Sequence, residues 1–274
     1  MELVDTHCHI QSVGALEGEE YTRTLWEKAR ESDPDEVIAR ARNADVTRLI
    51  CVGCTLDDSR LAIDFVKSRE NCWASVGIHP HEASKYVSDG AMLAQFALLP
   101  SQLKVVAIGE CGLDYFYVNS DKESQQKVLE FQIQLALEHD LPVIFHVREA
   151  FDDFWPIFEG YYSQEKPIRG VLHSFTDSQA NLEKALDYGL YIGVNGIATF
   201  TKKPEQQDVY RQIPLEALLL ETDAPFLTPV PYRGKICEPY HVRTTLEFLA
   251  GQRRQPVETI AEATTGNARN LFGI

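Results

Sequence analysis

Residues 105–115 read Val-Val-Ala-Ile-Gly-Glu-Cys-Gly-Leu-Asp-Tyr, an apolar run that ends abruptly in the carboxylate of Glu110. A short, continuously apolar segment followed by an acid, glycine and aromatic residues is typical of a buried strand that delivers one side chain to the edge of a sheet. We therefore expect Glu110 at the carboxyl end of a strand and look for partners at the ends of other strands.

Similar short apolar segments recur along the chain and alternate with segments of helical periodicity. The predicted strands are residues 3–6, 49–53, 73–77, 105–110, 142–146, 170–173, 191–194 and 217–223. Asp33 before Pro34, and Asp121 before a long amphipathic segment, are typical helix starts. This alternation predicts an α/β fold, a single-domain TIM (β/α)8 barrel over residues 1–274. A doubly wound sheet is the alternative, but no glycine-rich phosphate loop follows the first strand.

Composition limits the class of protein. The chain has 274 residues, 44% of them hydrophobic, and a net charge of −15, which argues against adhesion to nucleic acid or anionic lipid through a broad basic face. The sequence shows neither a membrane span nor a signal peptide, so we expect a cytoplasmic protein without a membrane partner. The six cysteines are expected to be reduced; Cys51 and Cys54 form a CxxC whose role stays open.

Histidines and acids collect at the predicted strand ends. His7 and His9 have the two-residue spacing that directs both rings to one side of an extended chain. All strands of a barrel open on one face, so distant side chains meet there, and imidazole with carboxylate ligands suits a divalent metal. The candidate metal ligands are His7, His9, Glu110, His146, His173 and Asp223.

These ligands fit two ions. Neighbouring strands one and eight supply His7, His9 and Asp223 for one ion, and strands five and six supply His146 and His173 for the other. Two metal ions about 3.5–4 Å apart share a bridging carboxylate and clamp the attacking and leaving oxygens of a phosphoryl transfer. We expect Glu110 to be this bridge and Asp223 to take the proton of the attacking water, which makes both of them catalytic.

Further residues are expected to bind substrate. Arg148, Arg233 and Lys235 follow strand ends and could meet phosphate oxygens. His79, at the end of the third strand, and Glu238 complete the predicted substrate-binding set.

With these residues assembled, the chain resembles the TatD family of metal-dependent hydrolases and deoxyribonucleases. The resemblance spans nearly the whole chain and is carried by motifs at residues 5–9 (DTHCH), 77–81 (GIHPH), 109–115 (GECGLDY), 145–148 (FHVR), 172–175 (LHSF), 193–197 (GVNGI), 221–225 (ETDAP) and 233–235 (RGK). It implies an amidohydrolase-superfamily barrel that hydrolyses nucleic-acid phosphodiesters as a 3'-5' exonuclease, on single-stranded DNA or 3' ends, with two divalent metal ions.

The metal, two sequence features and the substrate stay open. The resemblance implies Mg or Mn, whereas mixed imidazole and carboxylate ligands also suit Zn. Cys237 stands where the family usually has asparagine, and residues 14–32 form a longer segment that could cover the mouth as a lid. An esterase, lactonase, amidase or deaminase on the same scaffold is the alternative enzyme. A non-catalytic binding protein is the third hypothesis.

Overall fold

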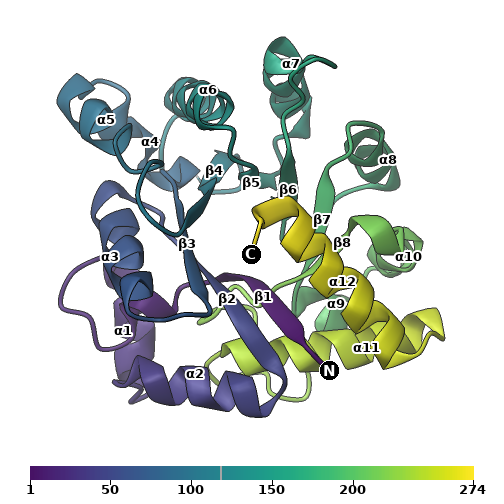
Figure 1. Cartoon of the computed structure of the whole chain (residues 1–274). Helices are drawn as coiled ribbons and strands as arrows, with labels where there is room; N and C mark the ends of the chain where they lie inside the picture. Colours follow the sequence, from purple (N-terminus) through teal and green to yellow (C-terminus); the bar gives the residue numbers. More distant parts are fainter. Residues whose placement is uncertain (118) are drawn as a thin grey trace.

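The computed structural model describes residues 1–117 and 119–274, and its eight strands form one parallel sheet in the order β1 to β8. Figure 1 looks along the axis of the resulting barrel, with helices around the ring of strands. The strands are β1 (Leu3–Cys8), β2 (Val46–Val52), β3 (Cys72–Val76), β4 (Val105–Asp114), β5 (Val143–Arg148), β6 (Gly170–His173), β7 (Tyr191–Val194) and β8 (Leu218–Leu220). The predicted (β/α)8 barrel is therefore confirmed.

Helices connect and cover these strands. They are α1 (Glu20–Lys28), α2 (Pro34–Asn43), α3 (Leu56–Lys67), α4 (Ala83–Tyr86), α5 (Gly90–Phe96), α6 (Lys122–His139), α7 (Phe151–Tyr161), α8 (Gln179–Asp187), α9 (Ile197–Phe200), α10 (Pro204–Gln212), α11 (Val242–Arg253) and α12 (Val257–Phe272). Short 3-10 turns are η1 (Ile10–Ser12), η2 (Pro80–Glu82), η3 (Leu215–Ala217) and η4 (Pro239–His241). None of the helices in the described residues has the length and apolar character needed to cross a membrane.

The predicted helix starts are present. Asp33 accepts a hydrogen bond from the backbone N–H of Asp35, with Pro34 in the first turn. Asp121 accepts from Ser124 at the start of the long helix α6. These caps satisfy backbone donors that a helix leaves unpaired at its N-terminus, so each helix begins where the sequence signal places it.

The barrel closes between its first and last strands. A single parallel bridge joins Cys8 to Ala224, and the backbone N–H of Asp223 donates to the carbonyl oxygen of His7 at 2.8 Å. Residues more than 200 positions apart in the sequence therefore lie side by side at the carboxyl end of β1.

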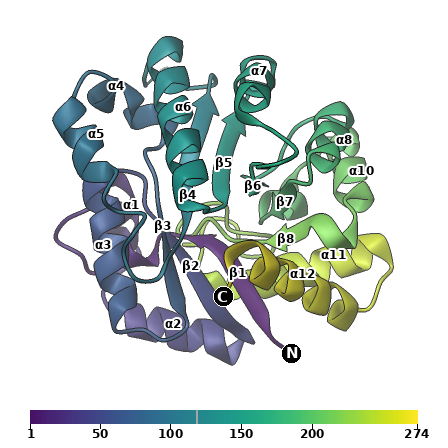
Figure 2. The same cartoon turned by 45° about the horizontal axis from the view of Figure 1, so that its top comes forward.

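The interior of the barrel is apolar at its amino-terminal end. Buried strand residues there pack with the last turns of α12, in a cluster of Val4, Ile50, Val52, Ala107, Ile144, Val171, Leu219, Ala268, Leu271 and Phe272. Asn267 of α12 donates to the carbonyl oxygens of Leu215 and Leu218, and Thr265 donates to that of Glu2. Figures 1 and 2 show α12 crossing this end of the barrel. We call this cluster the apolar plug.

Three strand predictions needed correction. His146 does not end its strand, because β5 continues to Arg148. Glu110 does not end its strand, because β4 continues to Asp114 with a register shift against β5 between Gly109 and Cys111. Such an irregularity redirects a side chain without ending the strand. Strand β8 is shorter than predicted, so Glu221 and Asp223 lie in the loop that follows it.

Candidate metal centre and active site

A cavity of about 580 Å³ opens at the carboxyl ends of the strands. It is lined by side chains from both halves of the chain: His9, Glu19, Tyr21, Thr22, Cys54, His79, His81, Glu82, Glu110, Asp114, Tyr117, His146, Val147, Arg148, His173, Ser174, Thr176, Ile197, Asp223, Phe226 and Leu227. This is the face on which barrels of this class carry their active sites.

Glu110 lies between two groups of histidines. Its Oε2 is 2.9 Å from Nε2 of His7, and its Oε1 is 3.2 Å from Nε2 of His79 and 2.9 Å from Nδ1 of His146. The preceding Gly109 has φ of 131°, and a Cβ there would lie 2.5 Å from the carbonyl oxygen of Ile144. Only glycine fits this approach of β4 to β5, and the two carboxylate oxygens of Glu110 face different partners.

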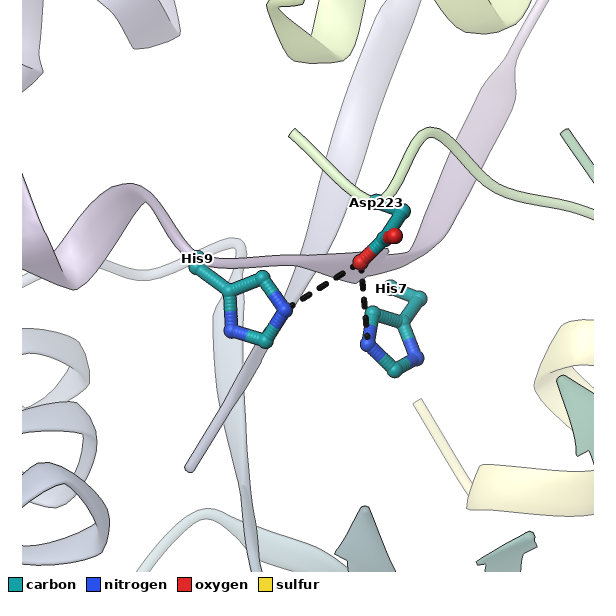
Figure 3. A group of neighbouring side chains, drawn as sticks. All are labelled: His7, His9 and Asp223. Atoms are coloured by element: carbon teal, nitrogen blue, oxygen red, sulfur yellow. Dashed lines mark hydrogen bonds and ion pairs between the residues drawn. The ribbon is translucent and has the colours of Figure 1, made fainter. Parts of the chain in front are cut away.

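The first group comes from β1 and the loop after β8. Nε2 of His9 lies 3.3 Å and Nε2 of His7 lies 3.6 Å from Oδ1 of Asp223, as Figure 3 shows. Nδ1 of His9 lies 2.8 Å from the carbonyl oxygen of Val52, which makes Nδ1 the donor and leaves Nε2 free to accept or ligate. Three potential ligand atoms therefore converge beside Glu110.

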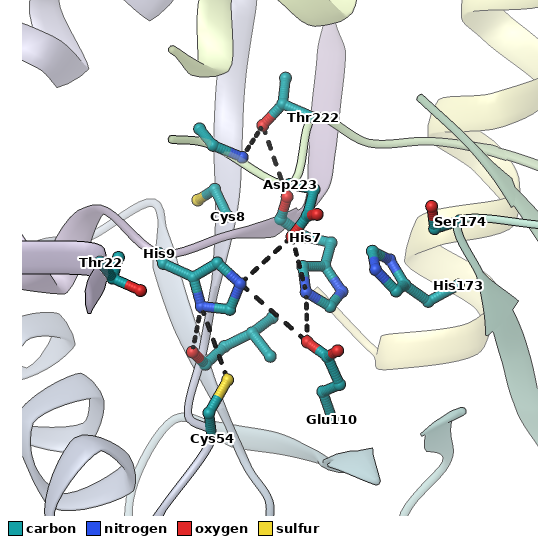
Figure 4. A network of polar contacts seen from close by, with 12 residues as sticks. His7, Cys8, His9, Thr22, Cys54, Glu110, His173, Ser174, Thr222 and Asp223 are labelled. Carbon is teal, nitrogen blue, oxygen red and sulfur yellow. Dashed lines mark hydrogen bonds and ion pairs between the residues drawn. The ribbon is translucent and has the colours of Figure 1, made fainter. Parts of the chain in front are cut away.

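Asp223 is held by the residues around it. Its φ of 63° is unusual for a residue other than glycine, and its N–H is fixed on the carbonyl oxygen of His7. The preceding Thr222 donates through its hydroxyl and its N–H to the buried carboxylate of Asp5, at 2.6 and 2.9 Å. The buried contacts of strand one thus set the conformation of the loop after strand eight. Figure 4 shows Thr222 and Asp223 of this loop beside His7 and His9.

The second group comes from β3, β4 and β5. His146 lies 2.9 Å from Glu110 through Nδ1 and 3.0 Å from Oδ2 of Asp114 through Nε2. The same Asp114 oxygen lies 3.1 Å from Nε2 of His81. The ring of His79 packs edge-on against that of His146, with centroids 4.7 Å apart. A second set of potential ligands therefore forms around His79, Glu110 and His146.

His173 lies against the first group rather than in the second. Its ring stacks on that of His7 with centroids 3.6 Å apart, and its Nδ1 is 3.0 Å from Oε1 of the buried Glu221. Its ring centroid is 6.3 Å from that of His146. Gly193 of β7 makes room for this arrangement, since a Cβ there would lie 2.3 Å from the Glu221 carboxylate.

The carboxylates of the centre are held in their ionised form. Burial raises the pKa of Glu110, but the nearby imidazoles of His7 and His79 together hold it well below its usual value. Burial also opposes ionisation of Asp114 and Asp223, yet hydrogen bonds from His146 and His9 respectively lower the pKa of each carboxyl. Three anionic groups therefore face one cavity.

The pKa values of the histidines shift in different directions. Burial lowers the pKa of His9, but its hydrogen bond to Asp223 and the nearby negative charges raise it overall to about 9. The pKa of His146 is likewise raised to about 9 against burial, by Asp114 and Glu110. Burial dominates at His79 and lowers its pKa to about 4. The carboxylates therefore favour positive charge at His9 and His146, but not at His79.

The buried geometry fits a metal cation. His7 is fully buried, and neither of its ring nitrogens makes a hydrogen bond of acceptable geometry to a residue that the structure describes. Nevertheless Nε2 points at the oxygens of Glu110 and Asp223. An unpaired buried imidazole facing two anionic oxygens is costly without a positive charge between them, and imidazole with carboxylate is a common donor set for divalent metals.

The structure places two of the five predicted substrate-binding residues at the cavity. His79 and Arg148 line the cavity, but the lining formed by the described residues includes none of Arg233, Lys235 and Glu238. Glu238 is buried and pairs with Arg40 at 2.7 Å. Arg233 stacks on the ring of Phe200 instead. His79 and Arg148 are thus at the cavity, whereas substrate binding by Arg233, Lys235 and Glu238 stays a prediction.

Three acids were missed as members of the centre, namely Asp5, Asp114 and Glu221. Asp114 shares β4 with Glu110 at an even spacing, and Glu221 precedes Asp223 by two residues, as His7 precedes His9. Even spacing places side chains on one face of an extended chain. That signal was available in the sequence, whereas the contact of Asp5 with Thr222 depends on the barrel closure.

The CxxC cysteines are separate thiols. All six cysteines are free; Cys51 is buried in β2, and Cys54 lies at the cavity wall with Sγ 4.0 Å from Nδ1 of His9. The predicted CxxC is therefore no disulfide in this structure.

Comparison with known proteins places this geometry in a family. The family model for TatD-related DNases matches residues 4–273. The chain is 37% identical over 276 residues to the uncharacterized metal-dependent hydrolase YcfH of Escherichia coli K12, covering all of this chain and 97% of YcfH. It is 36% identical over 248 residues to the 3'-5' ssDNA/RNA exonuclease TatD of Citrobacter rodentium, covering 88% of this chain and 92% of that protein. The crystal structure of the TatD homologue YjjV from Escherichia coli K12 superimposes with a TM-score of 0.85 at 30% identity, covering 99% and 98% of the two chains.

Proposed function

Since the chain belongs to the TatD-related DNase family of metal-dependent hydrolases, we propose that it is a 3'-5' exonuclease that hydrolyses phosphodiesters of single-stranded DNA at a two-metal site. The observation that carries the proposal is Glu110, whose two oxygens face separate groups of histidines. A carboxylate placed between two sets of potential ligands is suited to bind both ions of a two-metal centre, the kind of centre that phosphodiester hydrolysis uses.

The chain offers ligands for both positions. His7, His9 and Asp223 would hold one ion and His146 the other, with Glu110 common to both. His173 stacks on His7 in this structure, but its ring centroid lies 6.3 Å from that of His146, so it stays the proposed second imidazole for the ion at His146. His79, 3.2 Å from Oε1 of Glu110, is placed to fix that oxygen or to contact the substrate. Mg or Mn is the proposed physiological metal, with Zn also compatible with the donor set. Bound divalent cations would polarise the phosphodiester and lower the pKa of the attacking water.

The protein's own residues orient the reaction and manage the proton. Asp223 is ionised because its pKa is lowered, so it can accept the proton of the attacking water at neutral pH. His9 lies 3.3 Å away and stabilises the carboxylate in that position. Arg148 lines the same cavity and supplies a fixed positive charge for a phosphate oxygen.

The substrate class rests on the relatives and on the cavity wall. TatD of Citrobacter rodentium is named as a 3'-5' ssDNA/RNA exonuclease. In this chain the cation Arg148 is combined with aromatic side chains at the cavity, a combination that suits phosphate and base together.

All six cysteines are free, which supports a reducing, cytoplasmic compartment.

The test is a metal-reconstituted nuclease assay. The purified chain is treated with a chelator, reloaded with Mg²⁺, Mn²⁺ or Zn²⁺ separately, and given single-stranded DNA labelled at either end. We expect stepwise shortening from the 3' end that depends on added metal. Hydrolysis of esters or lactones with no cleavage of DNA would instead support the alternative hydrolase. A chain that binds no metal by calorimetry would support the non-catalytic hypothesis.

A further inference from the structure

Two aromatic groups border the cavity on opposite sides of the metal centre. Tyr21 and Phe226 lie beside the ends of β1 and β8, and their rings stack with centroids 5.9 Å apart and an interplanar angle of 17°. Phe116 and Tyr117 follow β4, and their rings pack edge to face at 4.7 Å. In a barrel whose strand order follows the chain, β4 and β5 lie across the axis from β8 and β1. The ligand cluster therefore lies between the two groups.

The first aromatic group, Tyr21 with Phe226, is positioned by the extra segment of residues 14–32. This segment contains α1, and its residues Glu19, Tyr21 and Thr22 line the cavity. The indole N–H of the buried Trp26 donates to the carbonyl oxygen of His9 at 3.3 Å. Glu19 caps α1 by accepting from the backbone N–H groups of Tyr21 and Thr22. Tyr21 is consequently held at the mouth by its backbone while its side chain stays 61% exposed.

The second aromatic group, Phe116 with Tyr117, lies against Arg148, a cation that lines the cavity. The guanidinium of Arg148 lies 4.0 Å from the ring centroid of Phe116 and 4.9 Å from that of Tyr117. These two rings are 48% and 46% exposed. A guanidinium that stacks through its face keeps the N–H groups at its edge available for a phosphate. Phe116, Tyr117 and Arg148 can thus meet a base and its phosphate together.

We propose that these two groups are base-stacking sites on either side of the scissile phosphate. Tyr21 with Phe226 receives one flanking base, and Tyr117 with Phe116 and Arg148 receives the other. This inference rests on the proposed nuclease function and adds what the substrate must be: an unpaired strand with a base on both sides of the cleaved bond. Paired bases are stacked within a duplex and cannot reach both walls, whereas every unpaired base offers a face to an aromatic ring.

Solvent exposure supports this assignment. Tyr21, Phe116 and Tyr117 gain little from the core, because about half or more of each side chain faces water. Rigid, exposed aromatic rings gathered around a charged cavity are typical of binding surfaces. Tyr21 also lies outside the motifs that carry the family resemblance, so those motifs do not reveal this part of the cavity wall.

The experiment pairs side-chain removal with base removal. Tyr21→Ala and Tyr117→Ala are compared on a short single-stranded DNA and on two matched substrates. Each matched substrate carries an abasic tetrahydrofuran residue on one side of the cleaved bond. KM and kcat are measured separately. Tyr21→Phe keeps the ring, and Leu16→Ala changes an exposed residue of the same segment that is absent from the cavity lining.

We expect Tyr21→Ala to raise KM about tenfold on the intact strand and to change kcat less than about twofold. On one of the two abasic substrates, Tyr21→Ala should have the same KM as the unmodified protein, because the base that Tyr21 would stack on is missing. Tyr117→Ala should match the unmodified protein on the other abasic substrate. Tyr21→Phe and Leu16→Ala should behave as the unmodified protein. Unchanged KM in both alanine variants, with DNA still cleaved by the unmodified protein, would overturn the stacking sites alone. A protein that cleaves no DNA would overturn the proposed function itself.

Discussion

The two ends of the barrel interior are built from the same strands and differ in almost every physical respect. Ile144 pairs with Val171 in the apolar plug, and two residues further along the same strands His146 pairs with His173 at the mouth. The plug contains no titratable side chain, whereas the mouth holds carboxylates and imidazoles whose pKa values are displaced in both directions. Along β5 and β6, a single residue pair lies between the apolar plug and the polar mouth.

This contrast indicates that the residues that stabilise the fold and the residues of the proposed active site lie at different ends of the barrel. Apolar burial at the plug contributes to folding in proportion to the area removed from water. The mouth buries charged groups that cost free energy unless they are paired, so it is maintained by the rest of the barrel. Substitutions at the two ends should therefore affect different measurements, and each prediction below tests that separation.

The largest effect is expected at the mouth, from Glu110→Gln. Loss of the shared carboxylate should reduce DNA hydrolysis by at least about a thousandfold, because a neutral amide cannot balance the charge of two cations. The metal-free variant should still fold and show one cooperative unfolding transition, since the substitution keeps the shape of the side chain. Steady-state kinetics and urea denaturation measure the two quantities; near-normal turnover would contradict the shared-ligand role.

The next effect is expected at the plug, from Phe272→Ala. This side chain is 5% exposed, and its truncation should lower the free energy of unfolding by about 3–5 kcal/mol. Turnover per folded molecule should stay within about twofold, because Phe272 belongs to α12, which contributes no described side chain to the cavity lining. Leu98→Ala is the control; Leu98 is 68% exposed and its truncation should cost less than about 0.5 kcal/mol. A large loss of turnover in Phe272→Ala at full folding would show that the ends are coupled.

An intermediate effect at the mouth is expected from Asp114→Asn. Asp114 accepts hydrogen bonds from His146 and His81, so its loss should disturb the orientation of His146 without removing a ligand. Apparent metal affinity should fall about 10- to 100-fold, which metal titration of the activity measures. Excess metal should restore most of the turnover. A defect that no metal concentration relieves would give Asp114 a direct role in the chemistry.

The smallest effect concerns acid stability near the mouth. Burial lowers the pKa of His241 to about 4, and its Nδ1 accepts the backbone N–H of Glu238. A histidine whose folded pKa lies below its unfolded value of about 6.5 favours folding at neutral pH, and this contribution is lost as the pH falls from about 6.5 to 4. His241→Gln should therefore reduce the loss of stability over that range by about 1–3 kcal/mol, measured by denaturation at each pH. An unchanged pH profile would exclude His241 as an acid-sensitive group.

The sequence predicted the barrel and most of its mouth because both depend on local patterns. Short apolar runs define strands, and the residue after each run lies at the same face, so His146 and His173 could be placed without coordinates. Glu110 was placed correctly at the mouth but wrongly at a strand end, since the register shift beside Gly109 has no simple sequence signal. The ion pair of Glu238 with Arg40 was not predicted, because the conformation of a long loop depends on tertiary contacts.

The most direct test of the shared role of Glu110 is the metal content of the purified chain. After chelation, reloading with Mn²⁺ and desalting, elemental analysis should find about two ions per chain in the unmodified protein. Glu110→Gln should retain fewer than one, because both positions lose a ligand together, while Phe272→Ala should retain about two. Two tightly held ions in Glu110→Gln would contradict the account, since Glu110 would then not be the residue that joins the two groups of ligands.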